Sequence, residues 1–294
     1  MSMLERTGFF AESWNVAWRK KTQGILLENQ SEPFNILKNS FRNWAADPFV
    51  FKYNGETYIF AELYDYILAR GCLGYCKWQG DHFGKWKKVF SEPYHLSYPC
   101  IFEKDDGIYI MPESGADRSL YCYKAIRFPD QWKRMPILRK DVVLGDTTPF
   151  TWNDHDYAFS YDVENTQSYY LKLLDLENPK KDCDFKKLEL QEMRRPAGKI
   201  FQHKGRWIRP AQNCTHSYGE GLVFYEFTLN DEFFREEAVE HIYPHELQFS
   251  KTIPMDGMHT YNFNDEFEII DLKTRRFNLL NFVCRIAHKI WRKK

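Results

Sequence analysis

Two widely separated aspartates, Asp47 and Asp146, have the residue type that acid–base chemistry requires. Each stands shortly before an apolar run, and a third carboxyl, Glu113, follows Met111-Pro112. Carboxylates brought close together repel one another, which shifts their pKa values toward a range useful for proton transfer. The ordinary alternatives are a turn aspartate before Pro48 and a solvated strand end at Glu113. We take the three acidic residues as candidate catalytic groups.

The densest polar string in the chain runs from Arg209 to Gly219. Arginine can bind a phosphate or carboxylate through two parallel hydrogen bonds, and amide and phenol groups suit sugar hydroxyls. The string supplies the candidate ligand-binding residues Arg209, Gln212, Asn213, His216 and Tyr218. Outside the string, the further candidates are His259, Lys199 and Arg118. An exposed histidine and ordinary solvating charges remain the alternatives for His216, Lys199 and Arg118.

Several familiar catalytic signatures are absent from the sequence. It holds no Gly-rich phosphate loop, no Ser-His-Asp order and no cluster with the spacing of metal ligands. The seven cysteines match no zinc or haem pattern, and we interpret them as buried, reduced thiols. The sequence therefore predicts no metal site.

The elements that must position these residues form a repeat. Each copy has an apolar pair, a short polar turn such as Asn54-Gly55, and an aromatic-rich strand that ends in an acid or amide. The copies begin at Phe49, Ile101, Phe150, Ile200 and Tyr261. Three to four strands per ~50 residues, repeated five times, predict an all-β fold, a five-bladed β-propeller. A β-sandwich is the alternative, but it does not predict a fixed spacing.

In a propeller the residues that precede each copy converge on the mouth of the central channel, here called the hub. Asp47, Asp146, Lys199 and His259 stand at or near such points. The return strands of the first four copies end in Glu62, Glu113, Asp162 and Gln212. Residues 14–18 are expected to supply the strand that closes the ring against the fifth copy, so that the propeller spans residues 1–274.

Residues 275–294 follow a different pattern. Apolar residues recur at steps of three and four at Leu279, Phe282, Val283, Ile286, Ile290 and Trp291. Five of the last ten residues are basic. This is typical of a C-terminal amphipathic helix that lies in a membrane interface, drawn to anionic lipid through residues 277–294. The alternative is a terminal helix packed on the propeller.

The overall composition limits which partners and which cellular compartment we expect. Forty-one basic residues balance forty-one acidic ones, so no global field favours nucleic acid as a partner. The N-terminus lacks the pattern of a signal peptide, and no apolar run approaches the ~20 residues of a spanning helix. We expect a cytoplasmic protein, peripherally associated with the inner face of the cytoplasmic membrane.

Several strings occur together in one order: His95-Leu-Ser-Tyr-Pro-Cys-Ile-Phe102, Ile110-Met-Pro-Glu-Ser114, Arg209-Pro-Ala-Gln-Asn-Cys214 and His259-Thr-Tyr261. From about residue 40 to 272 the chain resembles the N-terminal domain of plant glucosamine inositolphosphorylceramide transferases. It is also similar to bacterial propeller enzymes of surface-polysaccharide assembly that add ribofuranose from phosphoribosyl pyrophosphate. Trp44-Ala-Ala-Asp-Pro-Phe49 looks like the opening blade of five-bladed furanosidases.

The resemblance implies an inverting glycosyltransferase that builds a lipid-linked glycan of the O-antigen type. Asp47 would be the base that deprotonates the acceptor hydroxyl, and Glu113 would be the second carboxylate. Arg209 would bind the phosphates of the sugar donor, while Gln212, Asn213 and Tyr218 would hold the furanose. Asp146 matches the third-blade aspartate of the furanosidases only loosely. No cofactor is implied, although a diphosphate donor is compatible with a divalent metal such as magnesium.

Two other classes of function fit the same residues. A glycoside hydrolase acting on furanosides would use two carboxylates as acid and as base or nucleophile. A non-catalytic carbohydrate-binding propeller would not need the hub carboxylates at all.

Overall fold

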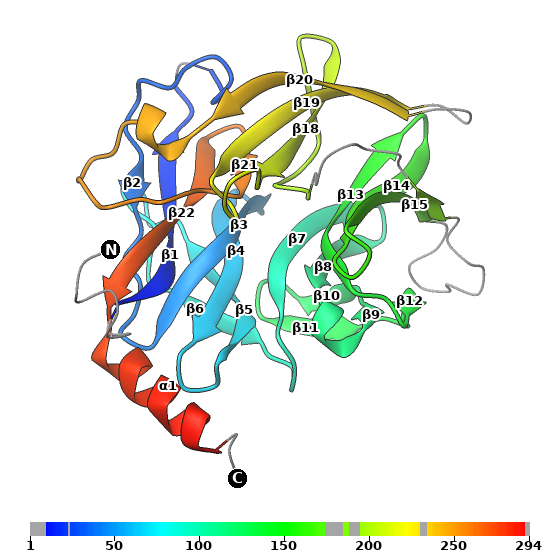
Figure 1. The fold of residues 1–294 in the computed structure, drawn as a ribbon. Helices are drawn as coiled ribbons and strands as arrows, with labels where there is room; N and C mark the ends of the chain where they lie inside the picture. Colours follow the sequence, from blue (N-terminus) through cyan, green and yellow to red (C-terminus); the bar gives the residue numbers. More distant parts are fainter. Residues whose placement is uncertain (1–9, 23, 174–184, 188–194, 230–233, 292–294) are drawn as a thin grey trace.

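The structure is a computed structural model that describes residues 10–22, 24–173, 185–187, 195–229 and 234–291. Five antiparallel sheets of four strands each surround a common axis (Figure 1), so the predicted five-bladed β-propeller is confirmed. The blades follow one another along the chain.

The first blade is formed by β3 (Asn43–Tyr53), β4 (Glu56–Asp65), β5 (Arg70–Lys77) and β6 (Lys87–Phe90). The second blade is formed by β7 (Ser97–Lys104), β8 (Gly107–Glu113), β10 (Tyr123–Arg127) and β11 (Gln131–Arg134). Beside it lies a two-stranded sheet of β9 (Ser119–Leu120) and β12 (Arg139–Lys140). The third blade is formed by β13 (Leu144–Trp152), β14 (His155–Asp162), β15 (Gln167–Leu173) and β16 (Phe185–Lys187).

The fourth blade is formed by β17 (Phe201–His203), β18 (Arg206–Asn213), β19 (Gly221–Leu229) and β20 (Phe234–Ile242). The fifth blade combines both ends of the chain, in the order β2 (Asn35–Ile36), β1 (Phe10–Lys20), β22 (Phe267–Phe277) and β21 (Tyr261–Phe263). Strand β1 pairs with β22 from Phe10↔Phe277 to Lys20↔Phe267. The prediction that residues 14–18 close the ring is therefore confirmed, and closure leaves no blade as an open end.

The innermost strands of the first three blades share one irregularity. Their register shifts lie at Ala46/Phe49 in β3, Ser97/Cys100 in β7 and Gly145/Thr148 in β13. The first residue of each bulge has a positive φ: 52° at Asp47, 45° at Tyr98 and 51° at Asp146. Left-handed backbone is uncommon at residues other than glycine, and bulges redirect side chains beside functional sites. The repeated bulge marks this level of the propeller as the hub.

Apolar side chains fill the spaces between neighbouring blades. Phe49 and Phe60 of the first blade are fully buried against Ile101 and Ile110 of the second. Burial of each such side chain is worth roughly 1.5–3 kcal/mol. The tight packing between the sheets holds the hub residues of different blades in fixed positions relative to one another.

The chain ends in α1 (Leu279–Trp291), which extends away from the ring (Figure 1). The predicted C-terminal helix is present, but residues 275–277 belong to β22, so the helix begins four residues later than expected. Within the described residues, none of the helices has the length and apolarity needed to cross a bilayer. Cys72, Cys76, Cys100 and Cys122 are free and buried, as predicted. Cys214 and Cys284 are free but only partly buried, so the prediction is wrong for these two, and Cys183 lies outside the described residues.

Candidate active site

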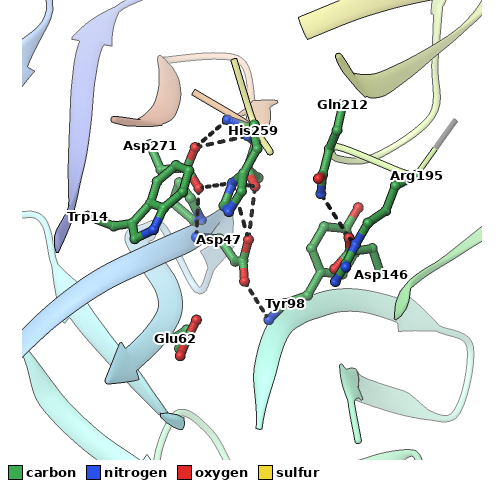
Figure 2. A network of polar contacts seen from close by, with 12 residues as sticks. Trp14, Asp47, Glu62, Tyr98, Asp146, Arg195, Gln212, His259 and Asp271 are labelled. Carbon is green, nitrogen blue, oxygen red and sulfur yellow. Dashed lines mark hydrogen bonds and ion pairs between the residues drawn. The ribbon is translucent and has the colours of Figure 1, made fainter. Parts of the chain in front are cut away.

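The three bulges bring residues of different blades into contact at the hub. The backbone N–H of Tyr98 donates a hydrogen bond of 3.1 Å to Oδ2 of Asp47. The Tyr98 hydroxyl lies 2.7 Å from Oγ1 of Thr148, two residues beyond Asp146. Tyr98 thus joins the two predicted aspartates, which are 5% and 2% exposed (Figure 2).

Asp47 is held by a network from the fifth blade. The Thr260 hydroxyl donates to Oδ1 of Asp47 over 3.1 Å, and the Asp47 N–H donates to Oδ2 of Asp271 over 3.0 Å. Asp271 also accepts the backbone N–H groups of His259 and Thr260, each over 2.9 Å. Nδ1 of His259 lies 2.7 Å from Oδ2 of Asp271 and 3.6 Å from Oδ1 of Asp47. The predicted hub residue His259 therefore lies between two carboxylates.

An aromatic side chain covers the histidine. The Trp14 indole stacks on the His259 imidazole with ring centroids 3.8 Å apart and an interplanar angle of 19°. Tyr218 meets the same imidazole edge-on at 5.5 Å and is 43% exposed, so its ring lies at the open side of the cluster. Trp14 is 2% exposed, and its indole shields the imidazole from water.

The electrostatic surroundings shift the titration of these groups. Burial raises the pKa of Asp47 to about 6, against the lowering effect of His259. Burial lowers the pKa of His259, but the carboxylates of Asp271 and Asp47 outweigh it and hold that pKa above its ordinary value. Burial raises the pKa of Asp271, but His259 and the backbone N–H donors bring it below its usual range. Asp47 therefore titrates closer to neutral pH than an ordinary aspartate does, beside an imidazole whose charged form is favoured.

A second centre forms around Asp146. Arg195, on the segment that leads into the fourth blade, donates through Nε to Oδ2 of Asp146 and through Nη2 to Oε2 of Glu113 over 2.6 Å. Gln212 donates to Oδ2 of Asp146 over 2.8 Å. Burial raises the pKa of Asp146 to about 6, against the lowering effect of Arg195. The predicted residues Asp146, Glu113 and Gln212 are thus brought together by an arginine that was not among the candidates.

The return strands place a second set of polar groups at the hub. Glu62 pairs with the residue before the bulge of its blade, and Glu113 occupies the same position in the second blade. Glu62 is buried, with Oε1 3.4 Å from Nε2 of His95, and burial raises its pKa well above the ordinary value. In the third blade the equivalent residue is Tyr161, not Asp162 as expected. Asp162 instead accepts backbone hydrogen bonds of a turn.

Other predicted binding residues have different partners. Arg209 is 2% exposed and pairs with Glu236 through Nη2 at 2.8 Å, with its guanidinium over the rings of Phe159 and Tyr225. Because Phe159 belongs to the third blade, this ion pair lies in the packing between the third and fourth blades. Successive side chains of a strand face opposite sides, so Arg209 and Gln212, three residues apart, cannot both face the hub. Gln212 is the one that faces it. The structure therefore contradicts the prediction that Arg209 meets a donor phosphate.

The remaining candidates also have partners other than the hub carboxylates. Asn213 donates to the Tyr243 hydroxyl over 3.1 Å and accepts the N–H of Thr215, which is a turn role. Arg118 forms an exposed ion pair with Glu164, and the side chain of His216 is 82% exposed beside Glu220. For Arg118 and His216 the structure favours the surface alternative. Lys199 lies with Nζ 5.5 Å from the centre of the Phe51 ring, and burial lowers its pKa.

Asp47, His259 and Asp271 also have the spacing of a metal site, since one ligand atom of each lies within 4.8 Å of the others. The same atoms, however, are engaged in the hydrogen bonds described above. These contacts already fix the positions of the three side chains relative to one another.

Trp14, Arg195 and Asp271 were missed by the sequence analysis. Asp271 is the acid that ends the fifth copy, which begins at Tyr261, and Arg195 stands shortly before the fourth copy, which begins at Ile200. Both signals were therefore visible as acidic or basic residues at hub positions. Trp14 was recognised only as part of the closing strand.

Comparison with known proteins agrees with this architecture. Residues 35–262 match the family described as "Glucosamine inositolphosphorylceramide transferase 1, N-terminal". The curated relative of that name from Oryza sativa subsp. indica is 26% identical over 212 residues, which cover 67% of this chain and 28% of the relative. The relative from Arabidopsis thaliana is 27% identical over 209 residues, covering 67% and 27%. The alignment thus spans less than a third of the length of these relatives.

Among solved structures, the catalytic domain of a GH62 α-L-arabinofuranosidase from Coprinopsis cinerea superposes with a TM-score of 0.57. It is 12% identical and the match covers 88% of this chain and 97% of that one, which supports the shared propeller fold alone. The resemblance to furanosidase propellers is confirmed at that level. Because the family match extends over most of the chain, this protein belongs to the family of glucosamine inositolphosphorylceramide transferase 1 N-terminal domains.

Proposed function

We propose that this chain is a glycosyltransferase whose reaction takes place at the hub, with Asp47 as the general base. The observation that carries the proposal is a buried carboxylate with a pKa of about 6, fixed in orientation by the fifth blade. A base with a pKa near the working pH is the effective one. The curated relatives are named transferases, which favours transfer as the reaction class.

The proposed step is a single displacement. Asp47 takes the proton of the acceptor hydroxyl, the acceptor oxygen forms a bond to the anomeric carbon, and the bond from that carbon to the donor phosphate breaks. The phosphate leaves with the bonding electrons and the anomeric configuration inverts. Oδ1 and Oδ2 of Asp47 each accept one hydrogen bond in the network, from Thr260 and Tyr98, so each oxygen keeps a lone pair for the proton.

For the donor and the acceptor, the proposal rests on the sequence resemblance alone. We propose that the donor is a furanosyl phosphate such as phosphoribosyl pyrophosphate, and the acceptor a lipid-linked glycan of surface polysaccharide synthesis. Arg195, with 16% of its side chain exposed, replaces Arg209 as the cation available to the donor. Carboxylates outnumber cations at the hub, so a diphosphate is expected to bind together with a divalent ion such as magnesium.

A second candidate function is hydrolysis of a furanoside. The observation that favours it is Glu62, a buried carboxyl whose pKa lies well above the ordinary value and which can therefore carry a proton at neutral pH. Hydrolysis of a bond between sugars requires such an acid for the leaving alcohol. A phosphate leaving group requires none, so Asp47 alone suffices for transfer.

The two functions are separated by one experiment. The purified chain is incubated with phosphoribosyl pyrophosphate, magnesium and a lipid-linked acceptor mimic. The mass of the acceptor is then measured by mass spectrometry. We expect a mass gain of one phosphoribosyl group with the wild type and none with Asp47→Asn. The matched control is Asp162→Asn, which alters a third-blade aspartate in a turn. Release of free sugar from an aryl furanoside, without gain in the acceptor, identifies a hydrolase instead.

A further inference from the structure

Seven of the eleven large hydrophobic side chains that are exposed in the described part of the chain belong to three neighbouring segments. We call this set the apolar rim: Phe41, Ile67, Leu68, Phe277, Leu279, Val283 and Ile286. Their exposed fractions range from 43% to 64%. Exposed apolar residues scattered singly are normal, but a gathered set marks an interaction surface.

Hydrogen bonds hold the three segments together. Asn278, just before α1, donates through Nδ2 to the carbonyl of Phe41 over 2.9 Å. The N–H of Tyr66 donates to the carbonyl of Arg42 over 3.1 Å, and Arg42 forms an ion pair of 2.6 Å with Asp65. The turn that carries Ile67 and Leu68 is therefore tied to Phe41, and Phe41 is tied to the start of the helix.

Three apolar side chains of the helix are exposed on one of its faces. Leu279, Val283 and Ile286 are spaced by four and three residues, which places them on one face, and they are 55%, 54% and 44% exposed. Asn278 and Asn281 are 4% and 9% exposed instead. A helix that served only as a packed terminus would bury the apolar face and expose the asparagines.

The charge around the apolar rim indicates which kind of surface binds to it. Residues 273–294 contain eight lysines and arginines and no aspartate or glutamate. A cationic segment with an exposed apolar stripe complements the negative surface and the acyl interior of an anionic bilayer.

We propose that the apolar rim docks on an anionic membrane surface, with the β4–β5 turn and Phe41 inserting beside α1. The docking site is thus wider than the C-terminal segment and includes the first blade. It holds the protein at the membrane as a peripheral component.

This docking fixes the orientation of the hub. Phe41 precedes Asp47 by six residues, and Phe277 follows Asp271 by six, on adjacent blades. At ~3.3 Å per strand residue, both paths span at most about 20 Å. The rim therefore lies at the end of the blades nearer Asp47. Use of this geometry to reach a lipid-linked acceptor rests on the proposed function, whereas the docking itself does not.

The test is co-sedimentation of the full chain with vesicles of phosphatidylcholine alone or with phosphatidylglycerol. We expect binding only to the anionic vesicles, and a loss of at least about tenfold in apparent affinity for Ile67→Ser/Leu68→Ser. The matched control is Ile126→Ser/Val239→Ser, which removes exposed apolar groups of other blades and should bind as the wild type. If the turn variant does not fold, Phe41→Ser is measured with the same expectation.

Three results would overturn the proposal. The wild type does not bind anionic vesicles; or the turn variant binds as well as the wild type; or light scattering shows that the rim joins two copies of the chain and that rim variants are monomers. Turnover with a water-soluble acceptor separates this failure from that of the proposed function. Rim variants should turn over the water-soluble acceptor as the wild type does. If the wild type binds vesicles but does not turn over this acceptor, only the proposed transferase activity is rejected.

Discussion

Asp47 and Asp146 occupy the same position in two blades but have different neighbours. Each is the first residue of a bulge in an innermost strand, with φ of 52° and 51°, and each has its pKa raised by burial to about 6. Asp47 lies beside His259, which in turn is bound to Asp271. Asp146 is bound to Arg195 and Gln212.

Under the proposed function, the difference between the neighbours predicts different roles for the two aspartates. An imidazole can gain or lose a proton near neutral pH, whereas a guanidinium keeps its charge throughout. The centre around Asp47 can therefore change its protonation during a reaction. In the centre around Asp146 the partner keeps its charge and is held by Asp146, so under the proposed function we expect Asp146 to act as a positioning residue for Arg195.

The largest expected effect separates the two aspartates directly. Asp47→Asn should lower kcat by about 10³-fold, because general-base catalysis contributes roughly 10²–10⁴. Asp146→Asn should lower kcat by only about tenfold and raise KM for the donor, because it loosens Arg195. Steady-state kinetics on both variants measure kcat and the KM for the donor. A larger kcat loss for Asp146→Asn than for Asp47→Asn would reverse the assignment.

Arg195 is the next largest contributor. Arg195→Lys retains the positive charge but cannot bind Asp146 and Glu113 together through a planar fork, so KM for the donor should rise by about 10–100-fold with a smaller change in kcat. Arg118→Lys is the matched control, since Arg118 forms an exposed ion pair with Glu164. Equal kinetics for the two variants would remove Arg195 from the donor site.

The effect of His259 should be measurable in the pH dependence of kcat/KM. Its positive charge lowers the pKa of Asp47, so His259→Gln should shift the acid limb of kcat/KM to higher pH and reduce activity at neutral pH by about tenfold. His216→Gln, at an exposed position, serves as the control. An acid limb that stays in place would mean that the two groups titrate independently.

The smallest effect concerns the wild type itself. Because the pKa of Asp47 is raised to about 6, the carboxyl is protonated in acid and ionised above that pH. A base must be ionised, so kcat/KM should rise as pH increases through about 6 and then level off. The profile between pH 5 and 8 is sufficient to measure this limb. A rate that falls across this interval instead indicates that the protonated group is required.

The fold was predictable from the sequence because the signal recurs five times. Each hairpin is a local pattern, and the spacing of about 50 residues makes one arrangement consistent with all of them. The closing strand could also be predicted, since a propeller requires a partner for its last blade. The four-residue difference at the start of the helix arises because β1 keeps pairing with β22 as far as Phe277.

The site was only partly predictable, because strand parity and register decide which side chains face the hub. Arg209 and Gln212 stand three residues apart in β18, so they face opposite sides, and Arg209 pairs with Glu236. The register of the third blade likewise places Tyr161, and not Asp162, opposite Gly145, the residue before the bulge. Asp271 ends the fifth copy as an acid, but only the fold brings its carboxylate beside Asp47 and His259.

Transfer of radiolabelled ribose 5-phosphate from phosphoribosyl pyrophosphate to a lipid-linked acceptor, followed in parallel for the wild type and Asp47→Asn, tests the central claim most directly. The account predicts labelled acceptor with the wild type and a rate about 10³-fold lower with the variant. Unlabelled acceptor with the wild type, or equal labelling by the two proteins, contradicts it.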